Sequence, residues 1–439
     1  MVDPAEKPSL WKALGPGLLF AGAAVGVSHI VQSTRGGATF GTGAVLIVVV
    51  SCLIKWPAFR FGPLYAANTG NSLLAGYRQQ GRWALGLFGL LTISILFTTL
   101  AAVTVVTAGL LIHLFGLSTM LQDWGLSSSY HAPAVSLALF IGTGILLAAG
   151  GYRCLDAVMK VVMPVLILAS LVATLIAITR ISLEDFHLFP TLDTASDVGL
   201  TAAIVGWMPA PIDIAVWSSL WALARARTTG TQINRRSVLQ DFDAGYLVTL
   251  VLAICFVLMG AAIMHNSGKT FSSSSAVFAG EVVSLYTEQL GSWSWPIIAA
   301  AAFLAMLSTT VTVADGFPRA VAALVSEAWP SRNQGPEGSK TSYWIVFLVG
   351  ATGAMLILFF ALGRQAMNFT HLVDFVTITS FIAAPVLAFL NHRAVTSTEM
   401  PPELRPSRWL QIWSWLGIAM MAAFALGYIG FRLEIFSAS

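Results

Sequence analysis

The stretch from Gly15 to Gly41 has the length and apolarity of a membrane-spanning helix, but a polar segment interrupts it. Near its middle lie Gly26, Val27, Ser28 and His29, which make a poor interior for a continuous helix. An unpaired backbone amide is costly in hydrocarbon, so irregular backbone at that depth persists only where protein or a water-filled cavity surrounds it. The interruption is therefore a candidate binding site.

A second apolar stretch, residues 198–223, carries a similar interruption. Its centre contains Gly206, Trp207, Met208, Pro209 and Ala210. Interrupted segments in corresponding halves of a chain indicate the substrate site of a secondary transporter. We therefore expect the segments 26–29 and 206–210 to meet and to form the substrate-binding site.

The composition agrees with a protein that spans a membrane. Of the 439 residues, 56% are hydrophobic and 10% are charged, and the mean hydropathy is +0.79. Soluble domains carry about a quarter of charged residues. The lipid bilayer is the expected partner of such a surface, and nucleic acid is not. The three cysteines stand singly, without the spacing of a zinc or redox site, so we expect no cofactor.

Windows of about 20 mostly apolar residues match the hydrocarbon thickness of a bilayer. They predict about eleven spans, near residues 13–36, 43–65, 84–113, 133–150, 155–178, 199–223, 244–265, 294–324, 342–362, 372–391 and 409–432. Sixteen lysines and arginines fall in the segments on the N-terminal side of the membrane and four on the other. Positive charge favours the cytoplasmic side. We expect a multi-pass protein of a bacterial-type inner membrane, with a cytoplasmic N-terminus and an external C-terminus.

The order of the spans predicts an internal repeat within one transmembrane domain, residues 1–439. From each interruption five spans run to the end of their half, so the second half has the opposite orientation. This is the arrangement of inverted-repeat transporters. The first repeat is expected at 13–178, the second at 199–391, and an extra eleventh helix at 409–432.

One basic residue, Lys55, falls deep inside the second span. A charge at such depth is expensive and usually faces a partner inside the bundle. The candidate partners are the acids of the sixth, eighth and tenth spans, so we expect a possible charge network of Lys55 with Asp213, Asp315 and Asp374.

Several motifs, taken in order, resemble the Nramp family of metal-ion transporters, which share the leucine-transporter fold. They are GPG before the first interruption and GGATFG after it, GPLYAANTGNSLL, GGYRCLDAVMKVV, the pair Met208 and Pro209, and AAIMHNSG. The resemblance implies an all-α membrane protein with an inverted repeat of five plus five helices and an eleventh helix.

The resemblance also identifies what this chain lacks. The family's metal site contains Asp-Pro-Gly-Asn in the first helix, and at those positions this chain has Gly26, Val27, Ser28 and His29. In the Met-Pro-His motif of the sixth helix, Ala210 replaces the histidine. The charged ligand is absent, although divalent cations are held by matched charge and hard oxygens, or by imidazole and sulfur. The chain is therefore a divergent branch with no confident metal site.

The same interruptions suit an anion. Each exposes the N-terminus of a half-helix, where free amides and a positive partial charge gather. With no acid to repel it, a small inorganic anion is the better electrostatic match, and Ser28 and His29 would donate hydrogen bonds to it. Bicarbonate, which is small, planar and rich in acceptors, is the first candidate.

A coupling ion is suggested by the hydroxyl cluster of the eighth span, which contains Ser308, Thr309 and Thr312. The resemblance implies that such residues, with carbonyls of the unwound first helix, coordinate Na⁺. The alternative is that these hydroxyls bond back to the preceding turn of their own helix. Loss of the family's proton-path residues favours sodium over protons.

Two other functions stay open. The resemblance alone implies transport of a divalent cation such as Mn²⁺, Mg²⁺ or Fe²⁺, coupled to protons, and a passive channel is the second alternative. An enzyme is not expected, since the sequence contains no GxSxG, HExxH or GxxxxGK[ST] motif.

Overall fold

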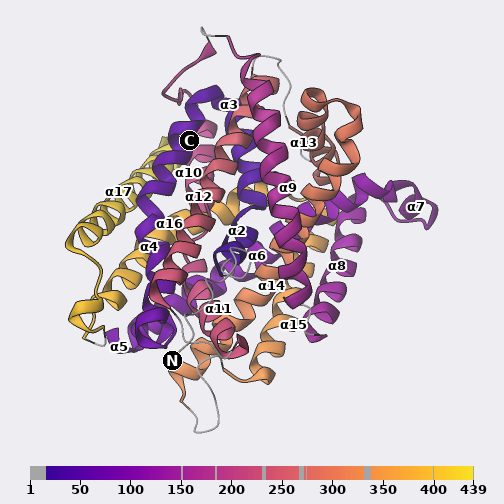
Figure 1. The fold of residues 1–439 in the computed structure, drawn as a ribbon. Helices are drawn as coiled ribbons and strands as arrows, with labels where there is room; N and C mark the ends of the chain where they lie inside the picture. The colour runs from indigo at the N-terminus through magenta and orange to yellow at the C-terminus, as the bar shows by residue number, and fades with distance from the viewer. Residues whose placement is uncertain are drawn as a thin grey trace, which may run out of the picture.

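The computed structural model describes residues 16–149, 152–182, 185–229, 234–265, 271–272, 274–330, 338–398 and 400–438. Over these residues every regular element is a helix (Figure 1). The all-α prediction is therefore confirmed. Residues 13–15, where the first repeat was expected to begin, lie outside the described residues.

The first half of the chain begins with an interrupted helix. Its pieces are α2 (Pro16–Ala24), the π-helix η1 (Ser28–Ser33) and α3 (Thr34–Phe40), followed by the short η2 (Gly41–Gly43). The helices that follow are α4 (Ala44–Thr69), α5 (Leu73–Gln80), α6 (Arg82–Phe115), α7 (Leu117–Asp123), η3 (Ser128–Tyr130), α8 (His131–Ala148) and α9 (Tyr152–Ile178).

The second half also begins with an interrupted helix, made of α10 (Ala195–Trp207) and α11 (Ile214–Thr229). After it come α12 (Arg235–Gly260), η5 (Ala261–His265), α13 (Ser275–Leu290), η6 (Ser292–Ser294), α14 (Trp295–Ala328), α15 (Lys340–Ile357), η7 (Leu358–Gly363), α16 (Phe369–Val395), η8 (Pro402–Leu404) and α17 (Arg408–Ala438). Each predicted span falls on one of these helices or on a pair of half-helices.

Eight helices of the described chain are long and apolar enough to cross a membrane. The other predicted spans fall on α9 and on the two interrupted helices. The first and sixth predicted spans are each divided by their interruption, and the fifth lies on α9, which runs from Tyr152 to Ile178. Large apolar side chains are exposed on the outer helices, among them Leu356, Phe359 and Leu426. Such a surface suits contact with lipid.

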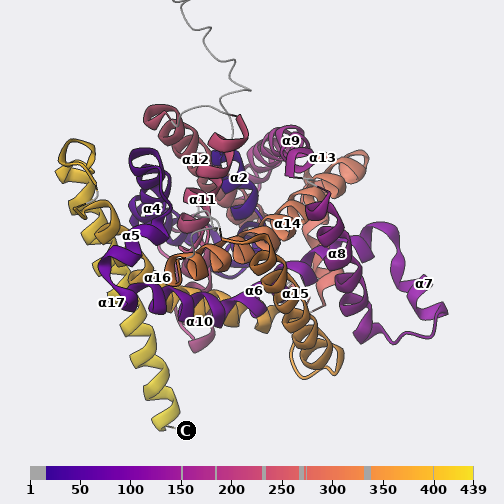
Figure 2. The ribbon, with the colours of Figure 1, turned by 90° about the horizontal axis from the view of Figure 1, so that it is seen from below.

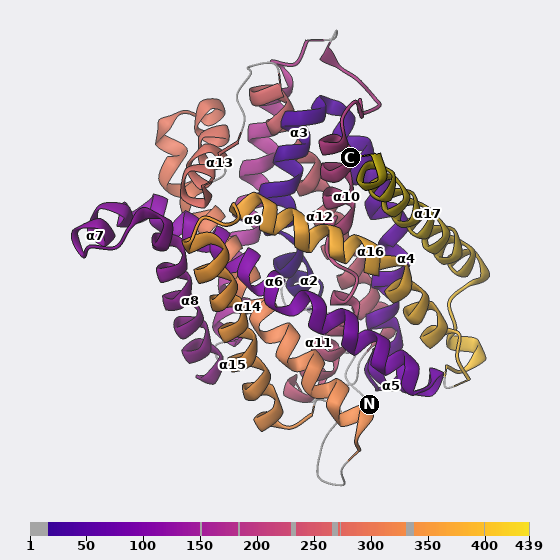
Figure 3. The same ribbon diagram turned by 180° about the vertical axis from the view of Figure 1, so that it is seen from behind.

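The two interrupted helices lie inside the bundle. The half-helix α2 packs against α9, α11, α12 and α14, while α10 packs against α16 and α11 against α4. The helices α7 and α17 lie at opposite sides of the bundle (Figures 1 and 2), and α17 flanks α4 and α16 (Figure 3). Irregular backbone is thus surrounded by protein, which is the condition under which a membrane protein tolerates it.

Candidate functional site

At the first interruption the helix ends and starts again, and the first backbone amides of the new helix lack intrahelical acceptors. The backbone amide of Gly26 bonds to the carbonyl of Ala24 at 2.9 Å, and the Gly26 carbonyl accepts from the amides of His29 and Ile30. Gly26 is therefore the residue at which the helix starts again. The amides of Val27 and Ser28 belong to the first turn, whose N–H groups a helix leaves without an intrahelical acceptor.

The second interruption lies between Trp207, the last residue of α10, and Ile214, the first of α11. Pro209 follows Met208, and proline lacks an amide and disfavours helical conformation in the residue before it. The helix restarts when the amide of Ile214 bonds to the carbonyl of Pro211 at 3.2 Å. The sequence signals of both interruptions therefore have direct structural counterparts.

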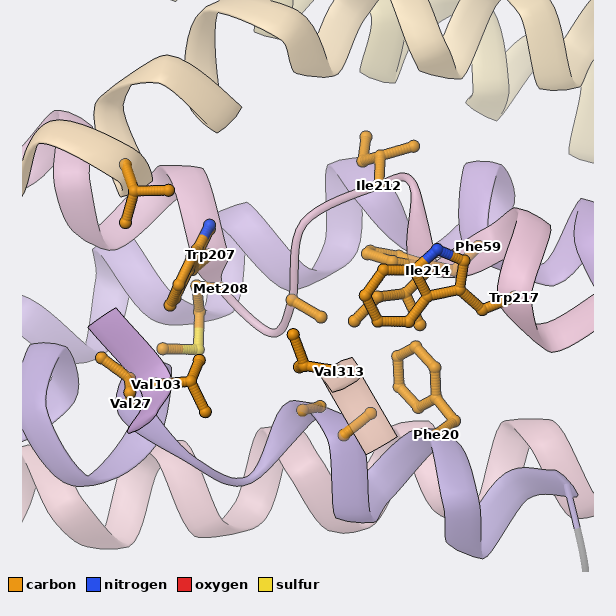
Figure 4. Packing of buried hydrophobic residues seen from close by; sticks show 14 of the residues in the cluster. Phe20, Val27, Phe59, Val103, Trp207, Met208, Ile212, Ile214, Trp217 and Val313 are labelled. Carbon is orange, nitrogen blue, oxygen red and sulfur yellow. The ribbon is translucent and has the colours of Figure 1, made fainter. Parts of the chain in front are cut away.

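A hydroxyl joins the two interruptions. The Ser28 side chain donates to the carbonyl of Ala24 at 2.6 Å, and its oxygen lies 3.3 Å from the carbonyl oxygen of Pro209. Figure 4 shows the two unwound segments facing each other, with Met208 reaching from the second toward Val27 and Val103. The two segments that we expected to meet are in contact.

A small cavity of about 20 Å³ lies between the interruptions, room for about one water molecule. Four of the nine predicted site residues line it: Val27, Ser28, Trp207 and Ala210. The other lining residues come from four helices and the second interruption, and are Ala23, Ala24, Thr99, Val103, Pro211, Ile214, Trp217, Thr309 and Val313. No carboxylate or imidazole is among the lining residues, and their side-chain oxygens are those of Ser28, Thr99 and Thr309.

The imidazole of His29, predicted to donate to substrate, is bonded within the protein. Its Nδ1 lies 2.8 Å from the Ser28 hydroxyl and its Nε2 lies 2.9 Å from the carbonyl of Thr249 on α12. His29 is fully buried and does not line the cavity. In this conformation it holds the first interruption against α12.

The four remaining predicted site residues also lie outside the cavity lining: Gly26, Gly206, Met208 and Pro209. A Cβ added to Gly26 would lie 2.6 Å from Oγ1 of Thr309, and one added to Gly206 would lie 1.9 Å from the carbonyl oxygen of Thr377. Both glycines therefore permit close helix packing. A carboxylate at position 26 would be directed at α14.

A cluster of oxygens surrounds Thr309 on α14. Its hydroxyl donates to the carbonyl of Gly22 at 2.8 Å, and lies 3.1 and 3.3 Å from the carbonyl oxygens of Ala305 and Val25. The hydroxyl of the adjacent Ser308 is buried and has no hydrogen-bond partner among the described residues. Gly22 is near the end of α2 and Val25 directly follows α2. The end of this half-helix and the intact helix α14 therefore bring their oxygens together here.

The third residue predicted for this cluster is bonded differently. The Thr312 hydroxyl donates to carbonyls of its own helix, those of Ser308 at 2.8 Å and Thr309 at 3.0 Å. This is the bond to the preceding turn that serine and threonine often make in helices. Thr312 therefore bonds to its own helix, which was the alternative to a role in binding Na⁺.

The expected pairing of Lys55 with an acid is wrong. Its Nζ donates to the carbonyl oxygen of Val205 and, at 2.8 Å, to that of Gly206. Both carbonyls end α10, and the interruption frees them from intrahelical bonds. The sequence does not indicate a carbonyl partner, because in a regular helix those oxygens accept from the amides of the next turn.

Two of the three candidate acids have other partners. Asp374 forms an ion pair with Arg35 at 2.6 Å, and Asp315 forms one with Arg319 at 2.8 Å. The carboxylate of Asp213 is buried just before α11, and neither oxygen has a hydrogen-bond partner among the described residues. Within the described residues, no group of three or more histidine, cysteine, aspartate or glutamate side chains is arranged to hold a metal ion.

A second, larger cavity of about 800 Å³ opens at the other end of the first helix. Its lining includes Arg35 and Asp374, together with residues of α3, α10, η5, α16 and α17. All these helix ends lie on the side that the charge bias predicts to be external. The two cavities share no lining residue.

Comparison with known proteins gives one relative of high similarity. No protein-family model matches the chain. A Pasteurella multocida protein described as uncharacterized protein PM0681 is 31% identical over 434 residues, which cover 98% of this chain and 94% of that protein. The chain belongs to the PM0681 family.

Solved structures show the fold of this PM0681 family member. A manganese transporter of Eremococcus coleocola has a TM-score of 0.71 at 16% identity, covering 99% of this chain and 90% of that one. MhsT in complex with L-phenylalanine has a TM-score of 0.61 at 15% identity, covering 94% and 97%. Mhp1, a nucleobase-cation-symport-1 family transporter, has a TM-score of 0.55 at 16% identity, covering 96% and 93%.

These similarities confirm the predicted leucine-transporter-type fold for the multi-pass chain. At such low sequence identity these similarities show the fold of the chain and do not identify its substrate. The expected boundaries of the two repeats and the orientation of the termini stay predictions.

Proposed function

We propose that this PM0681 family member is a secondary transporter that couples entry of Na⁺ to uptake of a small anion, with bicarbonate as first candidate. The observation that carries the proposal is the cavity between the two interruptions, whose lining contains hydroxyls and no carboxylate. The fold similarity to a manganese transporter and to Mhp1, a nucleobase-cation-symport-1 family transporter, supports the general role.

The polar groups at the cavity suit an anion. Val27 and Ser28 line it and lie in the first turn of the restarted helix, where free amides and the positive end of the helix dipole gather. The hydroxyl of Thr99 adds a donor. The hydroxyl of Thr99 is buried without a hydrogen-bond partner among the described residues, and a bound acceptor would satisfy it.

The oxygens around Thr309 suit Na⁺. The carbonyls of Gly22 and Val25 lose their usual intrahelical donors, because the amides of Gly26 and His29 bond to Ala24 and Gly26 instead. One hydroxyl hydrogen of Thr309 cannot satisfy both carbonyls, so this group has an excess of acceptors. The unpartnered Ser308 hydroxyl is the neighbouring oxygen. Transporters of this class coordinate coupling ions with carbonyls at unwound helix ends. Thr309 also lines the cavity, which would couple the two ions directly.

A divalent cation is the second candidate. It is favoured by the fold similarity to a manganese transporter and by the buried thioether of Met208 at the second interruption. The ligand set opposes it, since hard divalent ions require charged oxygen ligands. The separation of the outer and inner cavities supports alternating access over a passive channel, because a channel requires a continuous pathway.

Uptake into proteoliposomes tests the proposal. Labelled bicarbonate is expected to accumulate against its gradient when Na⁺ is imposed outside, and not when K⁺ replaces it. The same vesicles, loaded with a metal-sensitive dye, report Mn²⁺ entry. Mn²⁺ uptake that is independent of Na⁺, with no bicarbonate uptake, would contradict the anion proposal and support transport of a divalent cation. Bicarbonate flux that only follows its gradient would indicate a channel.

A further inference from the structure

Lys55 is a fully buried lysine in the middle of α4. No acidic side chain forms an ion pair with it among the described residues: the ion pairs of Arg35, Arg60 and Arg319 use Asp374, Asp243 and Asp315. Burying a charge costs several kcal/mol unless it is paired and hydrogen-bonded. A lysine in this position therefore needs a physical reason.

The partners of Lys55 are the last carbonyls of α10. Its Nζ donates to Val205 and Gly206, the two residues directly before Trp207, whose side chain lines the inner cavity. These carbonyls carry the negative end of the dipole of α10, so they favour a positive charge. Lys55 thus places its amino group at the edge of the second interruption, where these carbonyls favour its charged form.

Carbonyl oxygens at an unwound helix end are the groups with which transporters of this architecture hold dissolved cations. Here a covalently attached ammonium group already occupies them. A dehydrated metal ion at this end of α10 would lose those two ligands and would meet a like charge. A small anion near Trp207 would meet an opposite charge, at a depth where little solvent screens it.

We propose that Lys55 is the built-in cation of the substrate site, which excludes dissolved cations from the end of α10 and acts as the counter-charge of the transported anion. This inference rests on the proposed anion transport and identifies the residue that sets its selectivity. Lys55 is a positioning residue, since it acts through the field at the interruption and through the carbonyls of Val205 and Gly206.

The key variant is Lys55→Gln, because a glutamine amide retains two N–H donors for the two carbonyls and removes the charge. In Na⁺-driven uptake its KM for bicarbonate is expected to rise by about tenfold or more. Lys55→Met, which removes donors and charge, is expected to lose at least as much. Lys55→Arg keeps the charge and is expected to lie closer to the wild type than either.

A second readout separates this effect from a folding defect. Na⁺ binding without substrate, followed by the fluorescence of tryptophans such as Trp207 and Trp217 at the cavity, is expected to stay within about threefold of wild type in Lys55→Gln. The matched control is Arg60→Gln, which removes one positive charge from the same helix where Asp243 pairs with it outside the cavity. Its KM is expected to be unchanged.

Three results would decide against the inference or its basis. If wild type transports bicarbonate and Lys55→Gln has the same KM, the Lys55 proposal is overturned and the proposed function stands. If wild type transports nitrate, formate or chloride instead, the bicarbonate assignment fails and the same comparison is made with that anion. If wild type transports Mn²⁺ and no anion, both fail.

Discussion

Arg35 of α3 and Asp374 of α16 form two parallel hydrogen bonds, of 2.6 Å from Nη1 to Oδ1 and 3.0 Å from Nη2 to Oδ2. Gln32 donates to the same carboxylate at 3.0 Å and accepts from Arg35. Both charged residues line the outer cavity. The pair therefore holds the first helix against α16 at the lining of the outer cavity.

The ion pair predicts a reversible closure of the outer side. Asp374→Asn removes the charge that fixes Arg35, so uptake is expected to fall by about fivefold or more, because the closed state that precedes inward release is weakened. The charge swap, Arg35→Asp with Asp374→Arg, is expected to recover part of the rate. Initial rates of Na⁺-driven uptake measure both variants. A swap no better than the single variants would show that the pair acts through shape alone.

The oxygen cluster at Thr309 predicts a specific loss of Na⁺ affinity. Thr309→Val keeps the size of the side chain and removes the oxygen that meets three carbonyls. The Na⁺ concentration for half-maximal uptake is expected to rise by about tenfold. Thr312→Val is the matched comparison, since that hydroxyl bonds only to its own helix. Equal effects of the two variants would argue against Na⁺ at Thr309.

The close contact of Gly26 with Thr309 predicts that a larger residue at position 26 impairs Na⁺-dependent uptake. A methyl group at this position would lie 2.6 Å from the Thr309 side chain and would displace it from Gly22 and Val25. Gly26→Ala is expected to abolish Na⁺-dependent uptake while the protein still folds. Gly86→Ala in α6, whose new methyl group meets nothing within 4 Å, is the control and is expected to transport normally. Normal uptake by Gly26→Ala would show that the close approach of the two helices is dispensable.

The fold was predictable because its signals are local or ordered along the chain. Polar and proline residues inside apolar spans marked both interruptions, and the order of the motifs identified the leucine-transporter fold. The contact between the interruptions, through Ser28 and the carbonyl of Pro209, followed from that fold. These features depend on backbone character, which residue type encodes directly.

The direction of individual side chains was not predictable in the same way. The π-helix that begins at Ser28 changes the angular spacing of its side chains, and it turns His29 toward Thr249 and away from the cavity. The partner of Lys55 is a pair of carbonyls that only the end of α10 exposes, so no residue type announced it. Thr99 lines the cavity from α6, which carries several threonines, and residue type alone does not distinguish Thr99 from the others.

Thr99 gives a prediction in which stability and function move in opposite directions. Its buried hydroxyl has no partner among the described residues, and an unsatisfied buried polar group costs about 1–3 kcal/mol. Thr99→Val replaces it with an isosteric apolar group, so the melting temperature of the purified protein is expected to stay equal or rise. The KM for bicarbonate is expected to rise by about threefold or more, because a donor to the anion is lost.

Thr92→Val, at an equally unpartnered hydroxyl of the same helix outside the cavity, is expected to change stability in the same direction and leave KM unaltered. If both variants leave KM unaltered, the Thr99 hydroxyl takes no part in holding the substrate, and Ser28 with the free amides beside it must hold the anion without it.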